Sequence, residues 1–157
     1  MTTMPIIDGY CAIWGSRVDA QCVRRGALKR YRRVAVTVSH ALALELASPP
    51  QFTEDHLGIK TSTQLADTAL SRTLIDAMRQ GSFLSMSYSY RHAKLRPVWC
   101  DGQRLDVVVA ADMVEFCYTA SPRQPQAVCR LVSQPTWPAD PQAYAKLIHL
   151  LKERQSA

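Results

Sequence analysis

The stretch Leu84-Ser85-Met86-Ser87-Tyr88-Ser89-Tyr90-Arg91 alternates serines with apolar or aromatic residues. Because successive side chains of a β-strand point to opposite faces, the pattern predicts a strand with one buried face and one face of three hydroxyls. An ordinary amphipathic edge strand has the same pattern. A serine becomes a nucleophile only when a base lies within hydrogen-bond reach and a third group orients that base. Other parts of the chain must supply those partners.

The segment before this strand is the clearest helix in the sequence. Asp67 is suited to cap its N-terminus, and Gly81 stands where a C-terminal cap belongs. Leu70, Leu74 and Met78 recur between them at helical spacing. We therefore predict a helix over residues 67–80 whose apolar face packs on a sheet.

The remaining apolar runs mostly predict strands. Residues 25–31 indicate a short helix or turn, and a terminal helix is expected at about 140–154. The segment 105–118 contains two strand candidates around residues 110–112. The other expected strands lie at 6–14, 34–40, 57–65, 84–92 and 128–132. Strands dominate and helices are few, so the predicted class is α+β, with a bent, barrel-like, mainly antiparallel sheet in a single domain over residues 1–157.

Composition excludes several classes of protein. With 47% hydrophobic and 20% charged residues, the chain is too apolar for a disordered protein. No run approaches the roughly 18 apolar residues of a membrane span, and residues 1–9 carry no secretory-signal pattern. We expect an intracellular protein without a membrane partner.

The cysteines and histidines show no metal-binding spacing. The cysteine count is odd and includes no C-x-x-C pair, so we expect reduced packing residues, no metal and no cofactor. The residues concerned are Cys11, Cys22, Cys100, Cys117, Cys129, His40, His56, His92 and His149.

Basic residues cluster between positions 24 and 33. Such a cluster is suited to neutralising phosphates, to docking an acidic protein surface, or simply to being a solvated face. No base-reading motif accompanies it, so nucleic-acid binding is a lesser alternative. The cluster comprises Arg24, Arg25, Lys29, Arg30, Arg32 and Arg33 and supplies much of the net charge of +6.

Two residues are candidate partners for the serines. His40 follows the apolar strand 34–38, where its ring would stand at the rim of a sheet. Glu115 lies inside the apolar run 113–118, where an unpaired carboxylate is costly to bury. Glu115 therefore needs a partner, and an imidazole is one candidate.

Four segments in order resemble the prohead (maturation) proteases of tailed bacteriophages, which share their fold with herpesvirus assemblin proteases. Residues 7–15 with the turn 25–28 resemble the family's opening strand and turn, and 34–40 resembles the strand that delivers the catalytic histidine. Residues 81–91 resemble the nucleophile block, and 114–118 with 122–127 resemble the acidic block. The resemblance covers about residues 6–132.

The resemblance assigns Ser87 as the nucleophile, His40 as the general base and Glu115 as the third catalytic residue. His92 is the alternative third residue, because the herpesvirus relatives use a second histidine there. Serines replace both glycines that flank the family's nucleophile, so a catalytically inactive copy stays open. We further expect Ser87 and His40 on adjacent strands, with the Ser87 Oγ within about 4 Å of an imidazole nitrogen.

The implied function is that of a serine endopeptidase of prohead maturation. It would cleave the scaffolding segment of a major capsid protein, and itself, inside the immature capsid in the host cytoplasm. The expected partners are the capsid protein and its scaffolding segment, with self-association as a further candidate. The alternatives are an inactive capsid-assembly factor of the same fold and a small basic nucleic-acid-binding protein.

Overall fold

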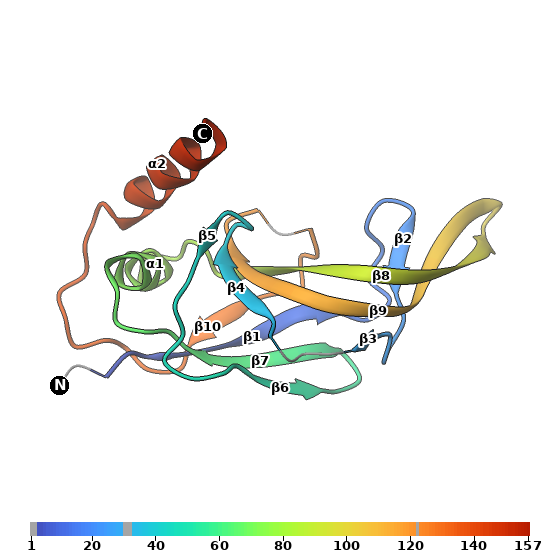
Figure 1. The fold of residues 1–157 in the computed structure, drawn as a ribbon, viewed down its shortest axis with the longest axis horizontal. Coiled ribbons are helices and arrows are strands. Elements are labelled where there is room, and N and C mark those ends of the chain that lie inside the picture. The colour runs from blue at the N-terminus through green and yellow to red at the C-terminus, as the bar shows by residue number, and fades with distance from the viewer. Residues whose placement is uncertain (1–2, 30–32, 122) are drawn as a thin grey trace.

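A long hairpin of two strands organises the molecule (Figure 1). In the computed structural model, which describes residues 3–29, 33–121 and 123–157, β8 spans Ser85–Cys100 and β9 spans Gln103–Thr119. β8 pairs antiparallel along one edge of β9. The other edge of β9 pairs in parallel with three short strands in succession, and β5 (Leu42–Ala43) extends the sheet beyond the last of them. These three are β2 (Gln21–Val23), β3 (Leu28–Lys29) and β4 (Ala35–Val38).

A second, antiparallel sheet lies against this one. Isolated bridges, Leu46 with Leu65 and Ser85 with Val128, connect the two sheets. Two sheets and two helices within the described residues confirm the α+β class. Neither sheet closes on itself in this part of the chain, so the barrel-like shape is not confirmed. The strand order of the second sheet is β10 (Cys129–Leu131), β1 (Ile6–Ile13), β7 (Gly58–Gln64) and β6 (Gln51–Glu54).

The buried core joins both sheets to the helices. Ile7 of β1, Ile59 of β7, Met86 of β8, Phe116 of β9 and Leu74 of the first helix are all fully buried in one apolar cluster. Met86 and Phe116 reach this cluster because successive side chains of a strand alternate between its two faces. Met86 therefore points to the face opposite to Ser87, and Phe116 to the face opposite to Glu115. The polar residues of these two strands therefore face away from the core.

Two helices flank the sheets. The first, α1 (Ala69–Arg79), buries Leu74 and Met78 as expected, and Gly81 follows its end with φ +87°. The expected cap at Asp67 is wrong: Thr68 accepts the Ser71 N–H at 3.1 Å. Asp67 instead binds the Arg72 guanidinium, which leaves the neighbouring hydroxyl as the cap. The second helix, α2 (Ala143–Gln155), packs against α1.

A buried carboxylate fixes the segment that leads to α2. Asp76 of α1, 4% exposed, accepts hydrogen bonds from Trp137 Nε1 at 2.9 Å, from the Asp140 N–H at 3.0 Å and from Arg79 at 3.1 Å. An unpaired carboxylate at this depth would strongly destabilise the fold, and the three donors provide the hydrogen bonds that the Asp76 carboxylate needs.

Several strand predictions need correction. β8 runs on to Cys100 rather than ending at 92, and β9 is one continuous strand rather than two, because Ala110, Ala111 and Asp112 all pair with neighbours. Residues 25–29 form a turn followed by β3. β2 and β6 were not expected, since β2 is only three residues long and β6 is short and mostly polar.

The predicted basic cluster is exposed where the structure describes it. Arg24, Arg25, Lys29 and Arg33 are all exposed. Tyr31, the rest of the cluster at Arg30 and Arg32, and Pro122 of the acidic block lie outside the described residues.

Replacing Gly9 by Ala tests the close packing of β1 against its neighbour β10 and against β8 of the other sheet. A Cβ at Gly9 would lie 2.5 Å from Cys129 Cβ and 2.6 Å from Met86 Sδ. We expect Gly9→Ala to lower the free energy of unfolding by about 1–3 kcal/mol through overpacking, measured by urea denaturation. Gly102→Asn is the control, because open space surrounds Gly102 and asparagine tolerates its positive φ. Equal stability of Gly9→Ala and the wild type would contradict this packing.

Candidate active site

A tight turn between β4 and β5 presents the His40 imidazole. The Ala41 N–H donates to the Val38 carbonyl at 3.0 Å, and both central residues, Ser39 and His40, have positive φ values of 49° and 58°. These are features of a type I′ hairpin turn. The left-handed backbone is strained for residues other than glycine, and such strain often marks functional sites. The turn leaves the His40 side chain 39% exposed at the end of the strand.

The Glu115 carboxylate on β9 lies below this ring and has three donors. His40 Nδ1 is hydrogen-bonded to Oε1, and Ser89 Oγ donates to the same oxygen at 3.3 Å. Thr37 Oγ1 donates to Oε2 at 3.3 Å. The Glu115 side chain is only 18% exposed, so these bonds supply the partner that its burial required. A carboxylate on Nδ1 favours the tautomer with the proton there and leaves Nε2 as a hydrogen-bond acceptor.

The other ring nitrogen, Nε2, faces the side chain of Cys117 on β9. The Cys117 thiol lies 3.4 Å from His40 Nε2. Cys117 pairs directly with Ser87 across β8 and β9. Directly opposite residues share a face with their Cβ atoms about 4.5–5.5 Å apart, so the Ser87 side chain lies beside Cys117. Ser89 pairs with Glu115 instead, and its Oγ is 3.4 Å from Nδ1.

The structure therefore brings the predicted site residues to one face, with one correction. His40 is bonded to Glu115, and Ser87 lies on the same face as Glu115, two residue pairs along the strands. The expected adjacency of the strands is wrong, because β9 lies between β8 and β4. No hydrogen bond joins Ser87 to His40 among the described residues.

His92, the alternative third residue, lies elsewhere. Its Nδ1 is 3.0 Å from Asp112 Oδ2, and its side chain is 77% exposed. The sequence reasoning placed Ser89 on the face of Ser87, but it did not predict the contacts of Thr37, Ser89 and Cys117 with Glu115 and His40. The alternation of a β-strand could have indicated two of these residues, because residues two apart share a face. Cys117 follows Glu115 by two residues, and Ser89 follows Ser87 by two.

A comparison with protein-family profiles matches residues 2–135, and the matching family is described as caudovirus prohead serine protease. The chain belongs to the caudovirus prohead serine protease family. This is a serine peptidase family of bacteriophages, and its name fits capsid maturation. A comparison with individual curated proteins gives no significant match. The helix α2 lies beyond the matched residues.

The nucleophile of a serine peptidase is a serine, whereas the thiol in contact with His40 belongs to Cys117. The thiol is the group nearest to Nε2, yet Cys117 is fully buried. Burial raises the pKa of the Cys117 thiol to about 12. At neutral pH the residue is therefore a protonated thiol rather than a thiolate, which is the nucleophilic form. Cys117 thus contacts the His40 imidazole without being suited to act as a nucleophile.

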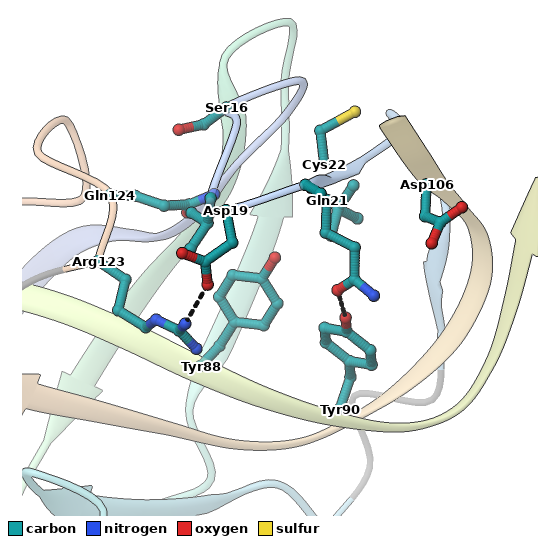
Figure 2. A pocket seen from close by; sticks show the side chains of 12 residues that line it. Ser16, Asp19, Gln21, Cys22, Tyr88, Tyr90, Asp106, Arg123 and Gln124 are labelled. Carbon is teal, nitrogen blue, oxygen red and sulfur yellow. Dashed lines mark hydrogen bonds and ion pairs between the residues drawn. The ribbon is translucent and has the colours of Figure 1, made fainter. Parts of the chain in front are cut away.

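A cavity lies on the opposite face of β8. It has a volume of about 380 Å³, and Figure 2 shows the Tyr88 and Tyr90 rings extending from β8 toward Asp19 and toward Gln21, the first residue of β2. The Tyr90 hydroxyl donates to Gln21 Oε1 at 2.7 Å. Because Tyr88 and Tyr90 alternate with Ser87 and Ser89, the sheet separates this cavity from the His40 site.

The described residues contain neither a cluster suited to a metal ion nor a helix suited to a membrane. No group of three or more His, Cys, Asp or Glu side chains there is placed to hold a metal ion. No helix in the same residues has the length and apolar character needed to cross a membrane.

Thiol labelling of the folded protein tests the state of Cys117. We expect iodoacetamide at pH 7.5 to modify the exposed Cys100 rapidly and to leave Cys117 unmodified, because its thiolate is scarce and buried. Mass spectrometry of peptides locates the label. The same reagent in denaturant should modify both residues. Labelling of Cys117 as fast as Cys100 in the native protein would refute this assignment.

Proposed function

We propose that this chain is a serine endopeptidase that cleaves the scaffolding segment of a major capsid protein, and itself, during prohead maturation in the infected cell. Ser87 is the nucleophile, His40 the general base and Glu115 the acid that orients the base. One observation carries the assignment: His40 is held at Nδ1 by Glu115 while Nε2 is directed toward the Cys117–Ser87 pair.

The proposed chemistry is serine acyl transfer. The Ser87 hydroxyl gives its proton to His40 Nε2 as Oγ attacks the scissile carbonyl carbon. The imidazolium then protonates the leaving amine, and water hydrolyses the acyl-enzyme with His40 again as the base. Glu115 stabilises the positive charge that His40 carries between these steps. Thr37 and Ser89 hold the two carboxylate oxygens in place for this role.

The position of each serine favours Ser87 over its neighbours. Ser89 contacts Nδ1, the nitrogen whose proton is directed to Glu115, so this contact offers no acceptor for a nucleophile's proton. Ser85 pairs with Thr119, two residue pairs beyond the Ser87–Cys117 pair. Ser87 alone pairs with the residue that touches Nε2.

A second candidate function is a catalytically inactive assembly factor. One observation favours it: the group in contact with His40 Nε2 is the Cys117 thiol rather than a serine hydroxyl. In an active enzyme a small rotation of the imidazole or of the Ser87 side chain must replace this contact during the reaction, since catalytic hydrogen bonds often tighten only with substrate bound.

Co-expression with the major capsid protein of the same phage tests the proposal. We expect the wild type to shorten the capsid protein, as measured by intact mass, and Ser87→Ala and His40→Ala to abolish the shortening. Removing a triad serine lowers turnover by about six orders of magnitude in a well-studied protease. Glu115→Gln should be milder, because the acid does not itself transfer the proton.

The neighbouring serines are the matched controls. Ser89→Ala should retain activity within about tenfold, since it removes one hydrogen bond worth about 1 kcal/mol to Glu115. Ser85→Ala should stay near the wild type. A dead Ser89→Ala beside an active Ser87→Ala would move the nucleophile by two residues. No shortening by the folded wild type would favour the assembly factor.

A further inference from the structure

Basic side chains continue the face of β8 that carries Ser87. Ser87 and Arg91 lie four residues apart on the strand and therefore share one face. Arg91 pairs with Asp112 of β9, and Lys94 pairs with Ala110, which is two residues from Asp112. Because directly paired residues lie on the same face of a sheet, Lys94 shares the face of Arg91. The face with the proposed nucleophile therefore extends into a stretch of positive charge.

β3, which lies beside β9, adds a third cation to this face (Figure 1). Lys29 pairs with Asp112 from the other side of β9, so Arg91, Asp112 and Lys29 form one row across the sheet. The preceding residue of β3, Leu28, is fully buried, whereas Lys29 is exposed. This alternation agrees with a lysine on the outer face. We call Lys29, Arg91 and Lys94 the basic strip.

The three cations of the basic strip have no acidic partner. All three are exposed, and none takes part in an ion pair within the described residues. The carboxylates of the same face are engaged by histidines: Asp112 Oδ2 lies 3.0 Å from His92 Nδ1, and Glu115 is bonded to His40. The basic strip therefore presents positive charge that the protein leaves unneutralised.

Turns beside the basic strip strengthen its positive potential. Arg24 and Arg25 precede β3, Arg33 precedes β4, and all three are exposed. Charges of one sign that gather on one side of a protein raise the local concentration of an oppositely charged ligand and speed its association. A second copy of this chain, with net charge +6, would instead be repelled. The surface is suited to an acidic ligand.

A polypeptide fits the basic strip better than a nucleic acid does. The strip shares a face with Ser87, and the substrate of a peptidase is a polypeptide. Proteins that bind single-stranded nucleic acid combine basic residues with aromatic rings on which the bases stack. The aromatic residues of β8, namely Tyr88, Tyr90 and Trp99, all alternate onto the opposite face.

The spacing along β8 indicates where the acidic residues of a substrate would lie. A strand rises about 3.3 Å per residue, so Arg91 lies about 13 Å and Lys94 about 20 Å from Ser87 along the strand. An extended substrate has the same rise per residue. Carboxylates about four to seven residues from the scissile bond would therefore reach these cations.

We propose that the basic strip binds an acidic segment of the polypeptide substrate, about four to seven residues to one side of the scissile bond. The inference rests on the proposed function, to which it adds the chemistry of the sequence beside the cleavage site. Complementary charges of this kind select a partner and guide its approach more than they add affinity. The basic strip thus favours cleavage sites with acidic flanks.

Two peptides test the basic strip. Both span a cleavage site mapped in the capsid protein, and a tract of Asp and Glu, or of Asn and Gln, covers the fourth to seventh residues on one side; the tract is placed on either side in separate peptides. The variant replaces Lys29, Arg91 and Lys94 together by Gln. An exposed ion pair contributes about 1.5- to 5-fold in binding. We therefore expect kcat/KM to fall by about tenfold for the acidic tract in one placement, and to stay within about twofold for the amide tract.

A control variant removes the same amount of charge elsewhere. It replaces three other exposed cations without an ion pair in the described residues by Gln, and its kcat/KM should stay within about twofold for both peptides. An equal loss in the two variants would assign the effect to overall charge and overturn the basic strip. Equal losses on both peptides, or no loss on either, would do the same. The three control residues lie on the second sheet and on α2: Lys60, Arg130 and Lys152.

A binding measurement keeps the inference independent of catalysis. Ser87→Ala protein should bind the fluorescent acidic-tract peptide, and the three strip substitutions should weaken that binding by about tenfold. If the wild type cleaves no peptide, the proposed function fails while this measurement still decides the basic strip. Equal binding with and without the strip cations would refute it. Binding of a DNA oligonucleotide, lost in the strip variant, without binding of the acidic peptide would assign the strip to nucleic acid.

Discussion

The largely buried carboxylate of Glu115 is the constraint around which the candidate site is built. A charge on a strand of the sheet must be satisfied by hydrogen bonds, and three different strands or turns contribute a donor. Thr37 comes from β4, Ser89 from β8 and His40 from the turn after β4. Satisfying this one charge brings together the three segments that the chemistry needs. It also fixes which nitrogen of the imidazole is free.

The register of β8 on β9 determines which of the three serines lies beside Glu115 and which lies beside Cys117. β9 lies between β8 and β4, so its residues Glu115 and Cys117 set the level of each neighbour on both sides. Ser89 is paired with Glu115, and Ser87 is paired with Cys117, the residue that contacts His40 Nε2. A shift of one residue in this pairing would turn all the hydroxyls toward the core, so the fold and the site depend on the same register.

The sequence predicted the parts of the site that follow from local pattern. Alternation placed the three serines on one face, and the apolar surroundings of Glu115 indicated that it needed a partner, which His40 supplies. The arrangement of strands could not be predicted in the same way. The position of β9 between β8 and β4, and hence the contact of Cys117 with His40, depends on pairing between residues nearly 80 positions apart. A strand of only three residues such as β2 is too short to carry a periodic signal, and the choice of Thr68 over Asp67 as a cap depends on the competing bond to Arg72.

Mapping the adduct of a fluorophosphonate tests the central claim most directly, because the reagent reacts with a serine only when a base activates it. The folded protein is treated with the reagent, digested, and analysed by mass spectrometry of its peptides, with His40→Ala protein treated in parallel. The account predicts a single adduct on Ser87 that is absent from His40→Ala. An adduct on Ser85 or Ser89 with Ser87 unmodified, or an equal adduct in the protein without His40, would contradict it.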